Sequence, residues 1–291
     1  MFRKILVSLT GFESDDAALD TAYLVGRLFN AHIHCICARP GPAQVAIGAT
    51  PFEIGAAMNA AELIADLQKE NELRAKNARL SFDRFCKRWD VSRTDVSADN
   101  CVSATWQNIS GDEVEATIAE ARFHDLVVLG RPVQATALST NGIGAVLVSS
   151  GRPLLVAPKT APENLAPTVA IAWKEGPEAA RAVTAAAPLL MKAHKVVVLT
   201  AFEGDSRVTA TVESAERVAA RFRRHGSTSE ARLVLPGGRT PHDAVLDTAV
   251  ASGADVLVMG GYGHSRLREL VFGGFTRHVL DSSPLPVFLF H

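Results

Sequence analysis

Residues 255–280 read D-V-L-V-M-G-G-Y-G-H-S-R-L-R-E-L-V-F-G-G-F-T-R-H-V-L. The apolar run at 256–259 has the length expected for a strand buried on both faces of a parallel sheet. Four glycines follow it, namely Gly260, Gly263, Gly273 and Gly274, and a helix is predicted at 275–281. Because glycine lets the main chain approach a ligand and a helix start offers unpaired N–H groups, the stretch predicts a phosphate-binding loop between a strand and a helix.

The glycine spacing differs from that of other common phosphate-binding loops. A P-loop requires G-x4-G-K-[ST], and the sequence contains no Gly-Lys-Ser or Gly-Lys-Thr; a dinucleotide-binding fingerprint would follow the first strand. The spacing here is G-x2-G-x9-G-G. It closely resembles the nucleotide loop of the universal stress protein family, G-x2-G-x9-G followed by Ser or Thr. Gly274 stands in the Ser/Thr position, and Thr276 lies two residues further on.

Composition favours a soluble cytoplasmic protein. The chain has 291 residues, of which 47% are hydrophobic and 21% are charged, enough for two domains with buried cores. With 30 basic and 31 acidic residues, no broad charged face for nucleic acid or an anionic membrane is expected. No apolar run approaches the roughly 20 residues that span a bilayer, and the first residues lead directly into a strand. The four cysteines lack C-x2-C spacing and are expected to be reduced.

One internal repeat organises the chain. Strand 4–9, a helix capped by Ser14 and strand 33–38 correspond to strand 168–173, helix 178–191 and strand 195–199. The copies also end alike, since 123–132 matches 254–262 and 146–158 matches 279–290. The first copy contains about 34 additional residues within 40–79, where a long helix is predicted at 53–89.

Each copy is therefore expected to be β-α-β-α-β-α-β-α-β. In the second copy the remaining elements are a helix at 213–224, a strand at 231–235, a helix that begins at the N-cap Thr240, and strands at 256–259 and 286–290. The predicted fold class is α/β, with two tandem doubly wound open sheets of five mostly parallel strands each and helices on both faces. The proline-containing segment 159–167 separates domains 1–159 and 168–291. The resemblance covers nearly the whole chain as two tandem universal stress protein domains.

Ligands of an open doubly wound sheet bind at the carboxyl ends of its strands. In the second copy, these ends and the glycine loop with its following helix give the candidate binding residues: Ala172, Trp173, Lys174, Thr200, Phe202, Gly260, Gly263, His264, Ser265, Gly273, Gly274, Phe275 and Thr276. The resemblance implies an adenine nucleotide such as ATP, which Mg can accompany. It also implies an Asp that accepts from the adenine amino group, but Lys174 stands there and is only a donor. Trp173 either stacks on a base or packs in the strand.

The first copy has lost the glycine loop. After Gly130 the sequence continues R-P-V-Q, without the second motif glycine, and Thr10 stands in the position of the Asp. This copy is expected to keep the fold and to serve as a partner surface for the second. His32 and His34 alternate on one strand face, but no third ligand is near in the sequence, so no metal site is expected. His242 and His278 are interpreted as helix-surface residues.

Two functions remain open. The first is a stress-response protein that binds an adenine nucleotide in its second copy, and the second is an interaction or dimerisation scaffold that binds none. The absent Asp and Ser/Thr favour the scaffold, whereas the intact glycine spacing favours the nucleotide. No catalytic residues are assigned, and ATP hydrolysis is expected to be slow at most.

Assembly is predicted from the last strand of each copy. The strands at 154–157 and 287–290 are short and apolar, and an uncovered apolar edge pairs readily. The two copies are therefore expected to form a pseudo-two-fold dimer with these strands adjacent, and a homodimer is a further expectation.

Overall fold

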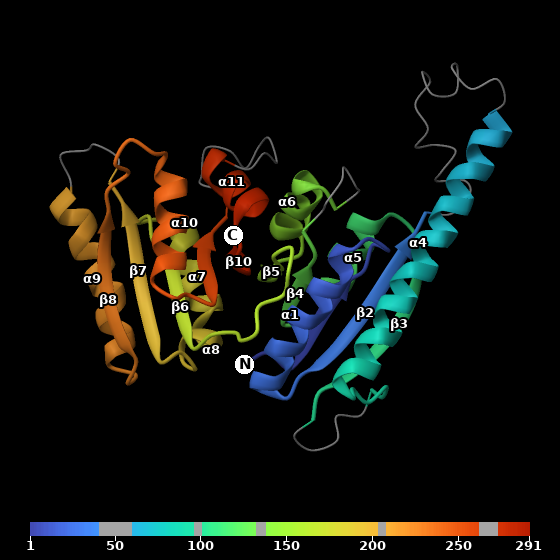
Figure 1. The fold of residues 1–291 in the computed structure, drawn as a ribbon, viewed down its shortest axis with the longest axis horizontal. Coiled ribbons are helices and arrows are strands. Elements are labelled where there is room, and N and C mark those ends of the chain that lie inside the picture. The colour runs from blue at the N-terminus through green and yellow to red at the C-terminus, as the bar shows by residue number, and fades with distance from the viewer. Residues whose placement is uncertain (41–59, 96–100, 132–137, 203–207, 262–272) are drawn as a thin grey trace.

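The chain folds as alternating strands and helices, as Figure 1 shows for the computed structural model, which describes residues 1–40, 60–95, 101–131, 138–202, 208–261 and 273–291. The first half contains β1 (Lys4–Ser8), α1 (Ser14–Phe29), β2 (His32–Arg39), α4 (Ala60–Trp89), β3 (Ser103–Ser110), α5 (Glu113–Ala121), β4 (Leu126–Leu129), α6 (Thr140–Ser149) and β5 (Leu154–Val156). The second contains β6 (Thr168–Ala172), α7 (Pro177–Ala185), α8 (Ala187–Leu190), β7 (Lys195–Ala201), α9 (Val208–Arg223), β8 (Thr228–Val234), α10 (Pro241–Ala251), β9 (Val256–Gly260), α11 (Gly274–Ser282) and β10 (Val287–Phe290). This order confirms the predicted α/β fold class.

One ten-stranded sheet runs through the molecule in the order β3-β2-β1-β4-β5-β10-β9-β6-β7-β8. Pairing is parallel within each half. β5 and β10 pair antiparallel at the junction, with Phe288 opposite Leu155. The predicted adjacency of the last strands is confirmed. The two sheets predicted from the sequence are therefore halves of one continuous sheet. β5 and β10 would each be an exposed edge strand alone, and here they pair with each other.

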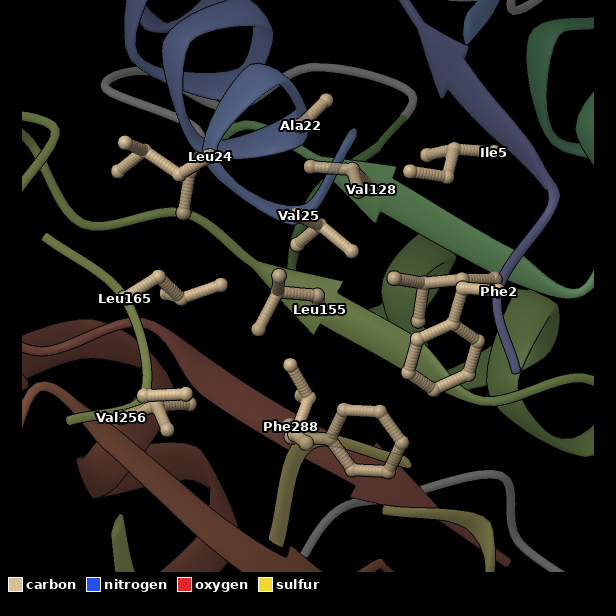
Figure 2. Close-up of a cluster of buried hydrophobic side chains, with 14 of the residues drawn as sticks. Phe2, Ile5, Ala22, Leu24, Val25, Val128, Leu155, Leu165, Val256 and Phe288 are labelled. Atoms are coloured by element: carbon tan, nitrogen blue, oxygen red, sulfur yellow. The ribbon is translucent and has the colours of Figure 1, made fainter. Parts of the chain in front are cut away.

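Two apolar layers cover the sheet. Helices α1, α4, α7, α8 and α9 pack on one face, and α5, α6, α10 and α11 pack on the other (Figure 1). The first layer is continuous across the junction, where Phe2 and Phe288 have ring centroids 6.2 Å apart. Figure 2 shows these rings beside Leu155, with Leu165 and Val256 on the side of the second half. The two halves therefore share one apolar core. Within the described residues, no helix is long and apolar enough to cross a membrane.

The start of α1 differs from the prediction. Ser14 was expected to cap this helix, but Glu13 is the N-cap and makes no side-chain capping hydrogen bond. Asp15 instead accepts hydrogen bonds from the backbone N–H groups of Thr10 and Gly11, at 2.9 and 2.8 Å. The loop before α1 is thus held by a carboxylate inside the first helical turn.

The prediction of a single helix at 178–191 is wrong. α7 ends at Ala185 and α8 begins at Ala187. Pro188 has no N–H to donate to the carbonyl of Thr184, so a continuous helix would lack a hydrogen bond and would have to accommodate the proline ring. By contrast, the predicted cap at Thr240 is confirmed, since its hydroxyl accepts from the N–H of Asp243.

The repeat extends to individual hydrogen bonds. In the first half the Asp125 carboxylate accepts from the N–H of Lys4 at 3.0 Å. In the second half the Asp255 carboxylate accepts from the N–H of Thr168 at 2.7 Å. Each aspartate precedes the fourth strand of its half and ties it to the start of the first strand. The same residue type therefore fixes the same strand pair in both copies.

Candidate functional site

Three strand ends meet in the second half at the predicted place. Ala172, the last residue of β6, pairs with Leu199 of β7 on one side and with Met259 of β9 on the other. Thr200 and Gly260 follow these partners directly. Because β9 and β10 are parallel, α11 runs back across the sheet and begins at this same edge. The structure therefore brings the described candidate residues to one edge.

Gly260 has a packing role at this edge. A Cβ atom there would lie 2.7 Å from the backbone nitrogen of Ala179, in the first turn of α7. Gly130 occupies the same place in the first half, where a Cβ would lie 2.8 Å from the Cβ of Ser14. Both glycines let a helix start pack directly on the end of a strand. Close packing alone thus accounts for this motif glycine in both copies.

The neighbouring Gly261 packs across the junction. A Cβ at this position would lie 2.4 Å from Leu147 Cδ2, in α6 of the first half. Near this contact, the Thr140 hydroxyl at the start of α6 donates to the Asp281 carboxylate of α11 at 3.2 Å. Part of the glycine run therefore serves the contact between the halves.

The start of α11 is open. Its N-cap is Gly273, which has no side chain to accept from the first N–H groups, and Gly274 is exposed, with no atom of the described residues within 4 Å of an added Cβ. Phe275 is half-buried, and Thr276 is only 7% exposed. Thr276 is therefore directed into the fold. Gly263, His264 and Ser265 lie outside the described residues.

The aromatic candidates differ in their surroundings. Trp173 is buried in the layer of α7 and α9, and its indole N–H donates to the Ser214 hydroxyl of α9 at 3.0 Å. This hydrogen bond matches the packing interpretation of Trp173. Phe202 is half-buried, and its backbone N–H donates to the carbonyl of Val234 at 2.9 Å. Its aromatic ring is therefore the one that remains available at the end of β7. Thr200 is 2% exposed.

The charges at this edge have both signs. Lys174 is exposed two residues after β6. The open start of α11 adds the positive end of a helix dipole. Glu178 is 9% exposed in the first turn of α7, where its carboxylate would lie 3.2 Å from a Cβ added to Gly176. Among the described groups, an anion at this edge would meet the Lys174 ammonium, the positive end of α11 and the Glu178 carboxylate.

In the first half the corresponding edge is filled by α4. A Cβ at Gly11 would lie 2.2 Å from the carbonyl oxygen of Arg74. The Arg74 guanidinium donates to the carbonyl of Thr10 at 2.9 Å, lies 4.7 Å from the centre of the Phe12 ring and is 3.5 Å from the Glu113 carboxylate. The cavity that remains is about 80 Å³, below the roughly 300–1,000 Å³ of small-molecule sites.

Two buried acids lie under this contact. Burial raises the pKa of Asp15 to about 6, although its hydrogen bonds from Thr10 and Gly11 act in the opposite direction. Burial likewise raises the pKa of Glu113 to about 7, and the nearby Arg74 partly offsets the rise. No pattern in the sequence predicts this pair, because residues from α1, α4 and α5 meet only in the folded chain.

The histidines are less isolated than expected. The structure brings Glu120 and His124 of the α5 region, which are distant from His34 in the sequence, against this histidine. In the second half, His242 and His278 are half-buried on α10 and α11, with ring centroids 4.2 Å apart. Their neighbour Asp243 accepts from His278 Nε2 at 2.7 Å.

Comparison with known proteins places this fold and edge in a family. Residues 167–291 match the model of the Universal stress protein family. Over 47 residues the chain is 34% identical to Universal stress protein MJ0577 of Methanocaldococcus jannaschii, a match that covers 16% of this chain and 29% of that relative.

Two solved structures extend the likeness to the whole chain. A universal stress protein from Archaeoglobus fulgidus matches 99% of this chain and 97% of its own, with a TM-score of 0.67 and 16% identity. A putative universal stress protein from Pseudomonas aeruginosa matches 99% and 93%, with a TM-score of 0.55 and 18% identity. At these identities the likeness shows a shared fold. Residues 167–291 therefore form a domain of the universal stress protein family, as the sequence resemblance indicated, and the whole chain shares the fold of its members.

Proposed function

We propose that the second half is a binding module for an adenine nucleotide such as ATP, in a stress response. The observation that carries the proposal is the open start of α11 at the edge where β6, β7 and β9 end. Among the described residues no side chain caps the N–H groups of this helix start, and such a start is a ready binding site for phosphate. The base would lie toward the ends of β6 and β7, where Phe202 offers an aromatic ring.

A second candidate function is an interaction scaffold that binds no nucleotide. The observation that favours it is the first half, where the same edge is occupied by Arg74 of α4 instead of a small molecule. Lys174 also supports the scaffold, because it cannot accept a hydrogen bond from an adenine amino group. Under this alternative, the open edge of the second half would receive a protein segment.

Two substitutions at Gly274 separate these functions. In the part of the chain that the structure describes, no atom lies within 4 Å of a Cβ at this exposed position, so both Ser and Asp fit there without displacing described atoms. Gly274→Ser supplies a hydroxyl to a bound phosphate and should raise ATP affinity by about 1 kcal/mol, or roughly fivefold. Gly274→Asp should lower the affinity, because its carboxylate would oppose the phosphates at the helix start.

Calorimetric titration with ATP measures both effects. An Asp in the first turn stabilises a helix through its dipole, so Gly274→Asp should keep the melting temperature of wild type. Loss of binding at an unchanged melting temperature therefore cannot come from unfolding. Equal affinities in wild type and both variants would place the phosphates elsewhere. A wild-type protein that neither binds ATP nor releases a nucleotide on denaturation, as judged by mass spectrometry, would favour the scaffold.

A further inference from the structure

Three potential metal ligands meet in the first half, away from the proposed nucleotide edge. His34 lies on the face of β2 that α5 covers, while Glu120 and His124 lie in and just after the last turn of α5. Because α5 leads into the start of β4, this cluster lies toward the amino ends of the strands. Its ligand atoms are all within 4.8 Å of one another.

The two imidazoles have a separation that suits a shared metal ion. His34 Nδ1 and His124 Nε2 are 3.1 Å apart, and their rings stack with centroids 5.1 Å apart. Two nitrogens bound to tetrahedral Zn²⁺ at about 2.0–2.1 Å are about 3.3 Å apart. A Zn²⁺ ion would therefore require the two nitrogens to separate by only a few tenths of an ångström.

Hydrogen bonds orient both rings. The carbonyl oxygen of Glu120 can only accept, so His124 Nδ1 donates to it, at 2.7 Å. This bond fixes the tautomer of His124 and leaves the lone pair of Nε2 directed at His34. The Gln107 side chain hydrogen-bonds the His34 ring. Imidazoles that bind metals are held by such outer hydrogen bonds.

The electrostatic surroundings keep both rings neutral, which is the form that binds metals. Burial lowers the pKa of His124 to about 4 and also lowers the pKa of His34. Lys4 and His32 act in the same direction, whereas the carboxylates of Glu120 and Asp95 act in the opposite one. Those two carboxylates also attract a cation.

We propose that His34, Glu120 and His124 form a binding site for Zn²⁺ or a divalent transition metal with the same ligand preference. Two imidazoles and one carboxylate are a common ligand set for such ions, and half-exposed Glu120 leaves the fourth position open to water. The bound ion would connect β2 to the end of α5. In the absence of metal, a hydrogen-bonded proton lies between His34 Nδ1 and His124 Nε2, where the ion would bind.

The cluster of His242, Asp243 and His278 in the second half serves as an internal comparison. The Asp243 carboxylate already accepts from the Thr240 hydroxyl in the helix cap and from His278. Each oxygen of this carboxylate already accepts one hydrogen bond, and the carboxylate forms part of the helix cap, so we assign it no metal. A variant in this cluster therefore tests whether any observed binding is specific to the first half.

Calorimetric titration of the chelator-treated full-length protein with Zn²⁺ at neutral pH tests the site. Wild type should bind one ion strongly, and Glu120→Gln should bind it at least about tenfold more weakly, because the variant loses a charged ligand on a half-exposed side chain. His34→Gln should abolish this binding. His278→Gln, the matched control, should bind as wild type does.

Visible absorption of bound Co²⁺ gives an independent measurement. The bands of low-coordinate Co²⁺ should appear in wild type and His278→Gln and should be lost in His34→Gln. Zn²⁺ should also raise the melting temperature of wild type but not of Glu120→Gln. Wild-type affinity in Glu120→Gln, absence of binding in wild type, or loss of binding in His278→Gln would each overturn the proposal.

Discussion

At the residue scale, two motif glycines that look alike in the sequence have opposite surroundings. Gly260 packs against the first turn of α7, whereas no described residue lies within 4 Å of a Cβ added to Gly274. Gly260→Ala should lower the free energy of unfolding by about 1–3 kcal/mol through overpacking. The matched variant Gly274→Ala should be neutral or stabilising by up to about 1 kcal/mol, because alanine favours the helix. Chemical denaturation of both variants measures the difference, and equal effects would contradict the packing role of Gly260.

A second residue-scale prediction concerns pH. The pKa of Glu113 is raised to about 7 in the folded protein, from a usual value of 4.5. The folded state therefore holds the proton more strongly, so this contribution to stability is complete below about pH 4 and is lost as the pH rises through about 7. For Glu113 alone, the loss between about pH 5 and pH 8 is on the order of 2–3 kcal/mol.

Denaturation of wild type and Glu113→Gln across this pH range tests the effect. The variant should lose less stability as the pH rises, because glutamine has no proton to release. Glu115→Gln, in an exposed residue of the same helix, is the control. Parallel pH profiles for wild type and Glu113→Gln would show that Glu113 does not titrate in this range.

At the element scale, the end of α4 is fastened to α1 through Asp20. The indole N–H of Trp89 donates to Asp20 Oδ1 at 2.7 Å, Arg88 donates to Oδ2 at 2.6 Å, and the Trp89 ring stacks on Tyr23 with centroids 4.4 Å apart. Asp20→Ala should therefore destabilise the docking of α4 by about 1–3 kcal/mol. Asp20→Asn keeps an acceptor for the indole and should cost less. Trp89 fluorescence during denaturation reports the change, and identical curves for the two variants would exclude this role.

At the scale of the whole molecule, the shared core predicts that the halves unfold together. Phe288 is fully buried at the junction and packs near Phe2 of the other half. Phe288→Ala should lower the free energy of unfolding by about 3–5 kcal/mol. The effect should reach both halves, because the sheet and one apolar layer are continuous between them.

The three tryptophans allow each half to be followed separately. Trp89 and Trp106 lie in the first half, and Trp173 lies in the second. In Trp173→Phe the fluorescence reports only the first half, so adding Phe288→Ala to that background should shift its transition to lower denaturant. An unshifted transition would show that the first half folds independently.

The sequence by itself determined the α/β fold class, the order of strands and helices apart from the break between α7 and α8, and the adjacency of the last strands. These properties follow from local patterns: buried strands are apolar, caps such as Thr240 have recognisable residues, and an apolar edge requires a partner. It also indicated the family of the second half, because the glycine spacing at 260–274 lies within one continuous stretch.

Only the tertiary structure decided what individual residues contact. In the folded chain Gly260 packs against the start of α7, and the Trp173 indole donates to Ser214. Arg74 occupies the edge of the first half that corresponds to the proposed nucleotide edge. The tertiary structure also brought His34 to residues about 90 positions away. The reason is that these contacts depend on distances between elements remote in the chain, whereas spacing along a sequence reports only the periodicity within each element.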